Sequence, residues 1–297
     1  MRATMLLLLA TITARAAPLL PPQPGRVIGE IRSARVQAGD SLYDLARRHG
    51  VGAPALFRLN PGVNLWLPAA GTTVKLPTRY VLPDAEHEGI VINLPEMRLY
   101  DYTVGPEPEV FAVAIGDRDD PTPVGEFRVG WRRVDPPWRV PDSIRAERPN
   151  LPRIVPPGPD NPLGDRWLTI GTTSYGIHGT NIAWAIGNEA THGCVRLYAA
   201  DVHRLYDRAP WGTRIQLVYQ PIKWGLDERA IYVEVHPDVY GRAGQPFEAA
   251  LAGARALGIA GAVDREVLAD AVTRARGIPE RVDARPRDRE AGSVRGL

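Results

Sequence analysis

The chain has 297 residues, enough for one large domain or for two to three small ones. Hydrophobic residues make up 44% and charged residues 24%, which is ordinary for a soluble globular protein. The net charge of +2, with acids and bases mixed throughout, excludes the strongly basic class of nucleic-acid binders, and we expect no nucleic-acid partner. A polyanionic cell-wall surface is compatible with this charge.

The N-terminus has the pattern of a cleavable secretory signal, which we assign to residues 1–16. Arg2 precedes a short apolar run, and Ala14-Arg15-Ala16 is typical of a cleavage site. The run is too short to cross a bilayer as a helix; the alternative is the start of a buried helix. We therefore expect an exported protein that begins near Ala17, with a Pro- and Arg-rich linker over 17–32.

Residues 33–78 predict a small β-α-α-β unit. The apolar residues Leu42, Leu45 and Ala46 have i, i+3, i+4 spacing behind the capping pair Asp40-Ser41, which predicts the first helix. The other expected elements are a strand over 35–37, a helix over 53–59 and a strand over 73–76. The motif V-x-x-GDSL-x-x-LA-x-x-x-GV resembles a LysM module. That resemblance implies binding of N-acetylglucosamine-containing glycans such as peptidoglycan; a spacer that binds nothing is the alternative.

Residues 88–220 predict a mainly β domain. Alternating and continuous apolar stretches predict strands in GIVINLPEMRLYDY, which turns at residues 93–96, and in EVFAVAIG. The segment 131–165 is dense in Pro, Arg and Trp without a periodic pattern, so it is a binding loop or lid, or else disordered. Its tryptophans, with Trp167, line a groove or pack beneath the lid. AADVHRLYDRAP then predicts a helix, and TRIQLVY a final strand.

Residues 221–278 predict a C-terminal extension. AIYVEVHP has the pattern of a strand, and two amphipathic helices are expected near 247–257 and 264–276. The charged segment 279–297, interrupted by Gly and Pro, is expected to be disordered.

The only cysteine of the chain, Cys194, lies in the sequence THGCVRL. A single thiol in an exported chain cannot form an internal disulfide, so it is buried and inert, intermolecular, or functional. A nucleophilic thiol needs a base or a cation and donors for an oxyanion. The N–H groups from His192 to Cys194, with Gly193 between them, are candidate donors. Arg196 shares a face with Cys194 in an extended segment and can hold a substrate carboxylate.

Two histidines are candidates for the base that activates Cys194. His192 is two positions away, which is poor geometry for a linear proton transfer, whereas His178 comes from a separate strand. We favour His178 as the base, with the Gly179 carbonyl fixing its tautomer and His192 as electrostatic support. Arg196, Thr191, Thr180 and Asn181 are the expected substrate contacts.

The stretch HGTNIAWAIGNEATHGCVRL resembles the signature of the L,D-transpeptidases, in which an upstream His-Gly precedes [S/T]-H-G-C-[V/I]-R. GIVINLPEMRLYDY, TPVGEFRV, SIRAE, VPPGPDNPLG and YGIHGTN are similar to the LysM-bearing Gram-negative periplasmic subgroup of these YkuD-like enzymes. Thr191 stands where serine is common, and either hydroxyl can donate. The resemblance implies a mixed β-sandwich with Cys194 as nucleophile and His178 as base, supported by Gly179, His192, Gly193 and Arg196.

The family chemistry implies a substrate and a reaction. The enzyme would cleave the diaminopimelate–D-alanine bond of a peptidoglycan tetrapeptide stem through a thioester, without metal or cofactor, and a carbapenem would acylate the same thiol. The acceptor is a protein amine, which anchors an outer-membrane protein or lipoprotein, or a second stem, which gives a 3-3 cross-link. The subgroup favours anchoring. Water as acceptor would make the enzyme a carboxypeptidase or a hydrolase.

Two other hypotheses compete with the L,D-transpeptidase hypothesis. His178, His192 and Cys194 could form a three-ligand zinc site, although the short ligand spacings of known zinc motifs are absent. Alternatively, the chain binds the cell wall and has lost its chemistry. The other four histidines, His49, His87, His203 and His236, are expected to be structural.

Overall fold

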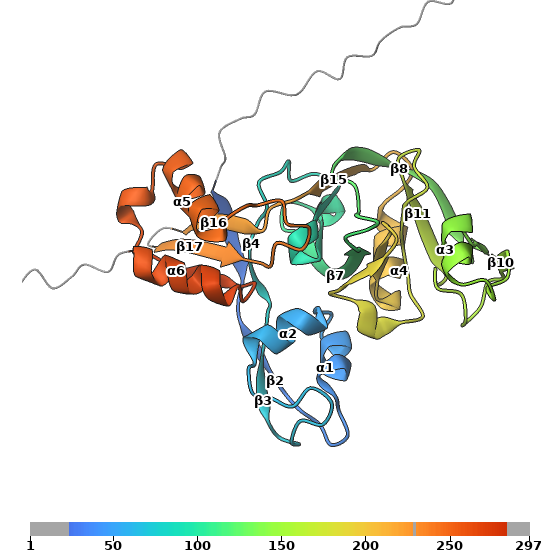
Figure 1. Cartoon of the computed structure of the whole chain (residues 1–297), viewed down its shortest axis with the longest axis horizontal. Helices are drawn as coiled ribbons and strands as arrows, with labels where there is room; N and C mark the ends of the chain where they lie inside the picture. The colour runs from blue at the N-terminus through green and yellow to red at the C-terminus, as the bar shows by residue number, and fades with distance from the viewer. Residues whose placement is uncertain (1–23, 228–229, 284–297) are drawn as a thin grey trace, which may run out of the picture.

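A computed structural model describes residues 24–227 and 230–283 of the chain (Figure 1). The expected signal sequence and the part of the expected tail beyond residue 283 lie outside the described residues. None of the helices in these ranges is both long and apolar enough to cross a membrane.

The central part of the chain is a nine-stranded mixed sheet that curls back on itself, because β7 pairs with β14 and also with β6 at the far edge. The strand order is β13-β7-β14-β12-β11-β8-β15-β5-β6. The strands are β5 (Ile90–Asn93), β6 (Arg98–Asp101), β7 (Glu109–Gly116), β8 (Gly125–Val134), β11 (Arg166–Ile170), β12 (Gly176–His178), β13 (Glu189–Thr191), β14 (Val195–Leu197) and β15 (Arg214–Val218). The expected fold class, mainly β with a sandwich-like catalytic region, is confirmed.

Apolar side chains fill the inside of the curled sheet. All four residues of β5 are buried, and helix α4 (Ala199–Arg208) adds the buried Val202 and Leu205 to the same core. The expected turn at residues 93–96 is confirmed: it holds the short helix η1 (Leu94–Glu96), after which Met97 has a φ of 54°. Another short helix, η2 (Tyr102–Val104), follows β6.

The expected β-α-α-β unit is present as β2 (Arg32–Arg35), α1 (Leu42–Arg48), α2 (Ala53–Leu59) and β3 (Thr73–Leu76), with β2 and β3 antiparallel. Ser41 caps α1 in a reciprocal capping box with Asp44. The predicted helix face is buried together with Val74 and Leu76 of β3 in a small core of its own. The periodic pattern of this segment was therefore sufficient to predict the unit.

A second sheet, of order β18-β17-β16-β1-β4, carries the C-terminal extension. Its strands are β1 (Gly25–Gly29), β4 (Arg79–Val81), β16 (Ile222–Asp227), β17 (Ala230–Val235) and β18 (Pro279–Arg281). The two expected helices are present as α5 (Pro246–Ala256) and α6 (Arg265–Arg274), with the short η4 (Ala260–Ala262) between them, and they pack on this sheet (Figure 1).

Two sequence-based assignments at the ends of this sheet are wrong. The expected linker over 17–32 contains β1, which pairs parallel to β16 and antiparallel to β4. The expected disordered tail begins with β18, and Val282 behind it is fully buried. Both errors have one cause: these short strands are stabilised by partners far away in the sequence, which local patterns do not reveal.

A cluster of buried charges joins the second sheet to the central sheet. The guanidinium of Arg98 on β6 lies 2.6 Å from Glu234 on β17 and 3.2 Å from Glu96. The ammonium of Lys223 on β16 lies 2.7 Å from Glu96 and 3.3 Å from Glu234. Burial alone would raise the pKa of Glu234, but Lys223, His236 and Arg98 lower it well below its usual range. Glu234 is therefore charged, and Arg98 and Lys223 compensate its charge.

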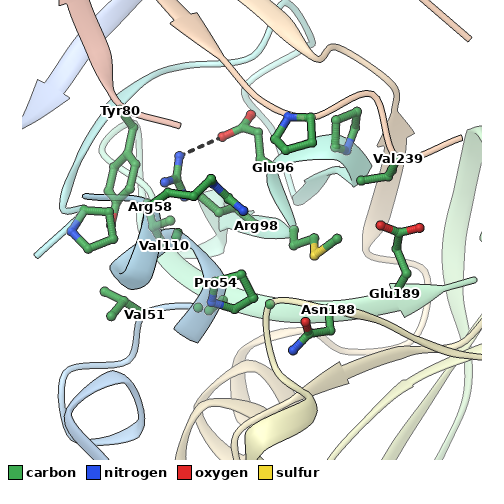
Figure 2. Close-up of a pocket in the computed structure, with 18 of the residues that line it drawn as sticks. Val51, Pro54, Arg58, Tyr80, Glu96, Arg98, Val110, Asn188, Glu189 and Val239 are labelled. Atoms are coloured by element: carbon green, nitrogen blue, oxygen red, sulfur yellow. Dashed lines mark hydrogen bonds and ion pairs between the residues drawn. The ribbon is translucent and has the colours of Figure 1, made fainter. Parts of the chain in front are cut away.

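The LysM-like unit packs directly on the central sheet. The Tyr198 hydroxyl donates to the carbonyl of Val51 over 3.0 Å, and a side chain on Gly187 would come within 2.9 Å of the Gly52 backbone. A cavity of about 150 Å³ lies at this junction. Figure 2 shows Arg58 of α2 on one side of it and Glu189, the first residue of β13, on another. The unit thus contacts the segment that leads to Cys194.

We predict that Glu234→Gln lowers the free energy of unfolding by about 3–5 kcal/mol, because Arg98 and Lys223 would be left as under-compensated buried cations. Urea unfolding followed by circular dichroism measures the loss. The exposed Glu266→Gln on α6 is the matched control and should change stability by less than about 0.5 kcal/mol. Equal stability of both variants would show that the cluster does not hold the sheets together.

Candidate active site

Cys194 lies in a tight turn between β13 and β14. The Thr191 hydroxyl closes this turn by donating to the Cys194 carbonyl over 2.6 Å. Gly193 has a φ of +89°, and a Cβ there would lie 2.3 Å from the ring of Tyr175. Only glycine satisfies both constraints, so the glycine before the thiol is required by the turn itself.

Strand pairing brings His178 to Cys194. β12 and β14 are parallel neighbours in which Ile177 faces Val195 and His178 faces Arg196. Side chains two residues apart on a strand share a face, so Cys194 lies on the same face as Arg196 and diagonally opposite His178. Cys194, His178 and Arg196 all line one cleft.

The ring of His178 is buried, with 2% of its surface exposed, and stacks on Trp167 at 5.4 Å between ring centroids. Its Nδ1 lies 2.6 Å from the Gly179 carbonyl, which can only accept, so Nδ1–H donates and Nε2 is left as acceptor. Burial lowers the pKa of His178 to about 3, and the charge of Arg196 adds to this effect. Hydrogen bonds to the backbone of Gly179 and Leu163 oppose it.

The Cys194 thiol is also neutral at rest. Burial raises its pKa above the ordinary value of 9.0, while a backbone hydrogen bond from Gly176 and the charge of Arg196 act in the opposite direction. The free protein therefore holds a neutral thiol beside a neutral imidazole rather than an ion pair. Such a pair can transfer its proton while the sulfur attacks, which is general-base activation.

The cleft around Cys194 has a volume of about 800 Å³ and a cationic lining. Four arginines line it, against a single acidic residue of the described chain, Asp160; they are Arg133, Arg139, Arg148 and Arg196. The Nε of Arg196 is buried without a hydrogen-bond partner among the described residues, and burial lowers the pKa of this guanidinium. The lining suits a substrate that carries carboxylates.

The Pro-rich segment 131–165 forms one wall of this cleft. It contains β9 (Trp138–Arg139), α3 (Asp142–Glu147) and β10 (Ile154–Val155), with β9 and β10 paired antiparallel. The buried amide of Asn161 donates to the Pro136 and Pro156 carbonyls and fastens the two ends of the segment. Trp131, Trp138 and Trp167 line the cleft. Of the two expectations for these tryptophans, this supports a role in lining a groove over packing beneath a lid.

The remaining predicted site residues differ in position. Asn181 lines the cleft, whereas Thr180 does not, and its hydroxyl accepts the Ile182 N–H over 3.0 Å. Thr191 also lines the cleft, but its hydroxyl donates to the Cys194 carbonyl within the turn; substrate contacts at Thr180 and Thr191 stay predictions. Among the described residues, the backbone N–H groups of Gly193 and Cys194 donate to no backbone acceptor, which leaves them available to an oxyanion.

The zinc alternative has no geometric support in the described chain. There, the only group of three or more His, Cys, Asp or Glu residues with ligand atoms within 4.8 Å of one another is Glu96, Glu234 and His236. Arg98 and Lys223 already neutralise that group, which leaves little attraction for a cation. His178, His192 and Cys194 do not gather in this way.

Sequence reasoning missed two partners of the site histidines. Asp120 lies 72 positions before His192 and receives its Nδ1–H over 2.7 Å, while Trp167 stacks on His178. No local signal identifies Asp120, because a run of aspartates in a turn is ordinary. In the sequence, Trp167 is distinguished only by its position next to the Pro-rich segment.

Comparison with known proteins assigns the family. The YkuD L,D-transpeptidase catalytic domain matches residues 87–217, and the LysM domain matches residues 34–77. Probable L,D-transpeptidase ErfK/SrfK of Salmonella typhimurium and Probable L,D-transpeptidase YbiS of Escherichia coli K12 are each 37% identical to this chain over 226 residues. These alignments cover 73% of this chain and 73% and 74% of the two relatives.

Solved structures of L,D-transpeptidases also resemble the chain, but weakly. A mutant enzyme of Enterococcus faecium has a TM-score of 0.35 at 19% identity and covers 50% of this chain and 54% of its own. L,D-transpeptidase 3 of Mycobacterium tuberculosis, with a faropenem-derived adduct, has a TM-score of 0.34 at 17% identity, covering 66% and 95%. Scores this low carry no argument about this chain.

The two family matches define the class: a YkuD L,D-transpeptidase catalytic domain in one chain with a LysM domain. These sequence matches show that the chain belongs to the L,D-transpeptidase family and is an L,D-transpeptidase. Its relatives ErfK/SrfK and YbiS come from Gram-negative bacteria.

The raised pKa of Cys194 predicts how this thiol reacts with iodoacetamide. Its alkylation is unambiguous to follow by mass spectrometry, because the chain has one cysteine. The rate should be small at neutral pH and keep rising past pH 9, because only the thiolate reacts. Arg196→Gln should move the midpoint to still higher pH, since the Arg196 charge favours the thiolate.

The exposed Arg255→Gln on α5 is the matched control and should leave the midpoint unchanged. A wild-type midpoint near or below neutral pH would contradict a neutral resting pair and would indicate a thiolate–imidazolium pair in the free enzyme.

Proposed function

We propose that this L,D-transpeptidase cleaves the diaminopimelate–D-alanine bond of peptidoglycan tetrapeptide stems and transfers the stem to an amine through a thioester on Cys194. One observation carries the proposal: adjacent parallel strands place a thiol and an imidazole on one face of a cationic cleft. The family assignment supports the reaction type, and the cleft chemistry supports an acidic peptide as donor.

In the first half-reaction the Cys194 thiol gives its proton to Nε2 of His178 as Sγ attacks the carbonyl carbon of diaminopimelate. The Gly179 carbonyl supports this step, because it holds Nδ1–H and stabilises the imidazolium that forms. The backbone N–H groups of Gly193 and Cys194 can donate hydrogen bonds to the oxyanion. When the C–N bond breaks, the imidazolium returns the proton to the leaving D-alanine amine, and a thioester remains.

In the second half-reaction an amine attacks the thioester carbonyl. The C–N bond forms, the C–S bond breaks, and the proton lost by the amine passes through His178 to the leaving sulfur. Each half-reaction thus leaves the imidazole neutral, and the second one also restores the neutral thiol. That agrees with the resting protonation that burial imposes on both groups.

Both matched domains, the YkuD catalytic domain and the LysM domain, support peptidoglycan as the partner. In the LysM unit, Trp66 is 70% exposed and its ring lies 5.1 Å from that of Tyr43. An exposed aromatic surface of this kind is suited to stacking against a sugar ring. The LysM unit would thus hold the glycan while the cleft holds the stem.

The acceptor divides the proposal into alternatives. An amine of an outer-membrane protein or lipoprotein would make the product a protein anchored to the wall, which we favour, and a second stem would make a 3-3 cross-link. With water as acceptor the chain would be an L,D-carboxypeptidase or a hydrolase that releases wall-bound protein. A non-catalytic peptidoglycan-binding protein is the further alternative. Each of these acts on the wall, so we place the mature chain in the periplasm.

We predict that Cys194→Ala abolishes D-alanine release from a purified disaccharide-tetrapeptide and that His178→Gln lowers kcat by about 10³-fold or more. Mass spectrometry follows both D-alanine and the new products. His203→Gln is the matched control: its ring binds Asp165 outside the cleft, and it should keep the wild-type rate.

The products decide among the alternatives. Dimers would identify cross-linking, release only after a candidate outer-membrane protein is added would identify anchoring, and tripeptide alone would identify the hydrolase. Full activity in Cys194→Ala would overturn the mechanism, and no release by the wild type would favour the non-catalytic protein.

Arg196→Lys should raise KM for the tetrapeptide by about tenfold or more, because lysine keeps the charge but loses the fork that pairs with a carboxylate. Initial rates over a range of tetrapeptide concentrations separate KM from kcat. The solvent-exposed Arg139→Lys, which lines the cleft from the Pro-rich segment, serves for comparison and should change KM less. An unchanged KM in Arg196→Lys would remove Arg196 from the binding site.

A further inference from the structure

The loop 117–122 and the C-terminal extension carry contacts that the proposed function does not use. The carboxylate of Asp120 receives Nδ1–H of His192 over 2.7 Å. Because a carboxylate only accepts, Nδ1 of His192 carries the hydrogen, and Nε2 is the acceptor of the neutral ring. His192 lines the cleft two residues before Cys194. The bond therefore orients a ring at the site of reaction.

The loop 117–122 is tied to the turn that carries Cys194. Asp117 N–H donates to the Thr191 carbonyl over 2.9 Å, and Asp117 in turn caps the N–H of Asp120 over 2.8 Å. A Cβ on Gly116 would lie 2.9 Å from Gly193 and 2.2 Å from the Asp120 carbonyl. The loop and the turn are thus in direct backbone contact, which is more than a solvent-exposed ion pair provides.

The C-terminal extension holds this loop from the other side. The Tyr240 hydroxyl donates to the Gly116 carbonyl over 2.7 Å and receives the Thr122 N–H over 3.2 Å, so it bridges the two ends of the loop. Arg118 Nε donates to the Val239 carbonyl over 2.8 Å. Figure 2 shows Val239 across from Glu189 at the start of β13.

Tyr240 is itself held in place. Its ring stacks on Tyr219 at 5.6 Å, and its N–H donates to the Tyr219 hydroxyl over 2.8 Å. The guanidinium of Arg242 also lies over the Tyr240 ring, 4.9 Å from the ring centroid. The hydroxyl of Tyr240 therefore has a fixed position from which to bridge the loop.

We propose that Asp120 is a positioning residue that sets the orientation and tautomer of His192 beside Cys194, and that Tyr240 holds Asp120 in place. The C-terminal extension is then part of the active site rather than an appendage. The catalytic consequence rests on the proposed function; the orientation of His192 does not.

The test uses the full mature chain with Asp120→Ala and Tyr240→Phe. Asp119→Ala, an exposed neighbour in the same loop, and Tyr232→Phe, another tyrosine of the extension, are the matched controls. Nitrogen-15 spectra of labelled histidine report which ring nitrogen of His192 carries the hydrogen, with His192→Gln giving the assignment. D-alanine release gives kcat and KM.

We expect Asp120→Ala to shift the His192 ring signals and to lower kcat by about tenfold or more with KM within about twofold, as for other residues that orient a functional histidine. Tyr240→Phe should act in the same direction but less strongly, and both controls should match the wild type. Unmoved His192 signals in Asp120→Ala, or an unchanged kcat, would overturn the proposal. If Tyr240→Phe does not fold, Arg118→Gln tests the same tether.

The two proposals fail in different ways. If the wild type releases no D-alanine, the proposed function fails, while the ring signals of His192 still show whether Asp120 orients it. If the wild type is active and Asp120→Ala is equally active, the reaction stands and the positioning role falls.

Discussion

The pairing of Glu96 and Glu234 with Arg98 and Lys223 is the interaction on which the arrangement of the chain depends. These four residues come from the central sheet and from the extension, and all four are buried. Separating the two sheets would expose or uncouple buried charges, which is costly. The pairing therefore fixes where the extension lies, and with it the position of Val239 and Tyr240 against the loop 117–122.

Burial governs the chemistry of the site as well as its shape. Trp167 covers His178, and the pKa values of His178 and Cys194 move in opposite directions, both toward the neutral form. A neutral thiol reacts slowly with oxidants, which would suit the proposed periplasmic location. Below pH 6.5 the unfolded chain would protonate His178 while the folded chain resists, so this residue reduces stability progressively as the pH falls toward 3.

The cleft is assembled from distant parts of the chain. The Pro-rich segment 131–165 supplies one wall through Asn161, and the strands around Cys194 supply the base. The LysM unit packs behind β13 through Val51 and Gly52. A glycan held by that unit and a stem held in the cleft would therefore be bound by parts of the chain that are in direct contact.

The sequence by itself was sufficient for the parts of this protein whose pattern is local. The helix face at Leu42, Leu45 and Ala46, the alternating strands, and the short motif around Cys194 with its upstream His178 each lie within a few tens of residues. They predicted the LysM-like unit, the mainly β class and the residues for which a catalytic role is proposed.

Tertiary structure decided everything that depends on contacts between distant segments. It placed β1 and β18 in a sheet, committed Thr191 and Thr180 to the backbone, brought Asp120 to His192, and brought Tyr240 to the loop that carries Asp120. Such contacts leave no periodicity in the sequence, because each partner is an ordinary residue in an ordinary turn or strand. Burial, which sets the protonation of Cys194 and His178, likewise exists only once the sheets have closed around them.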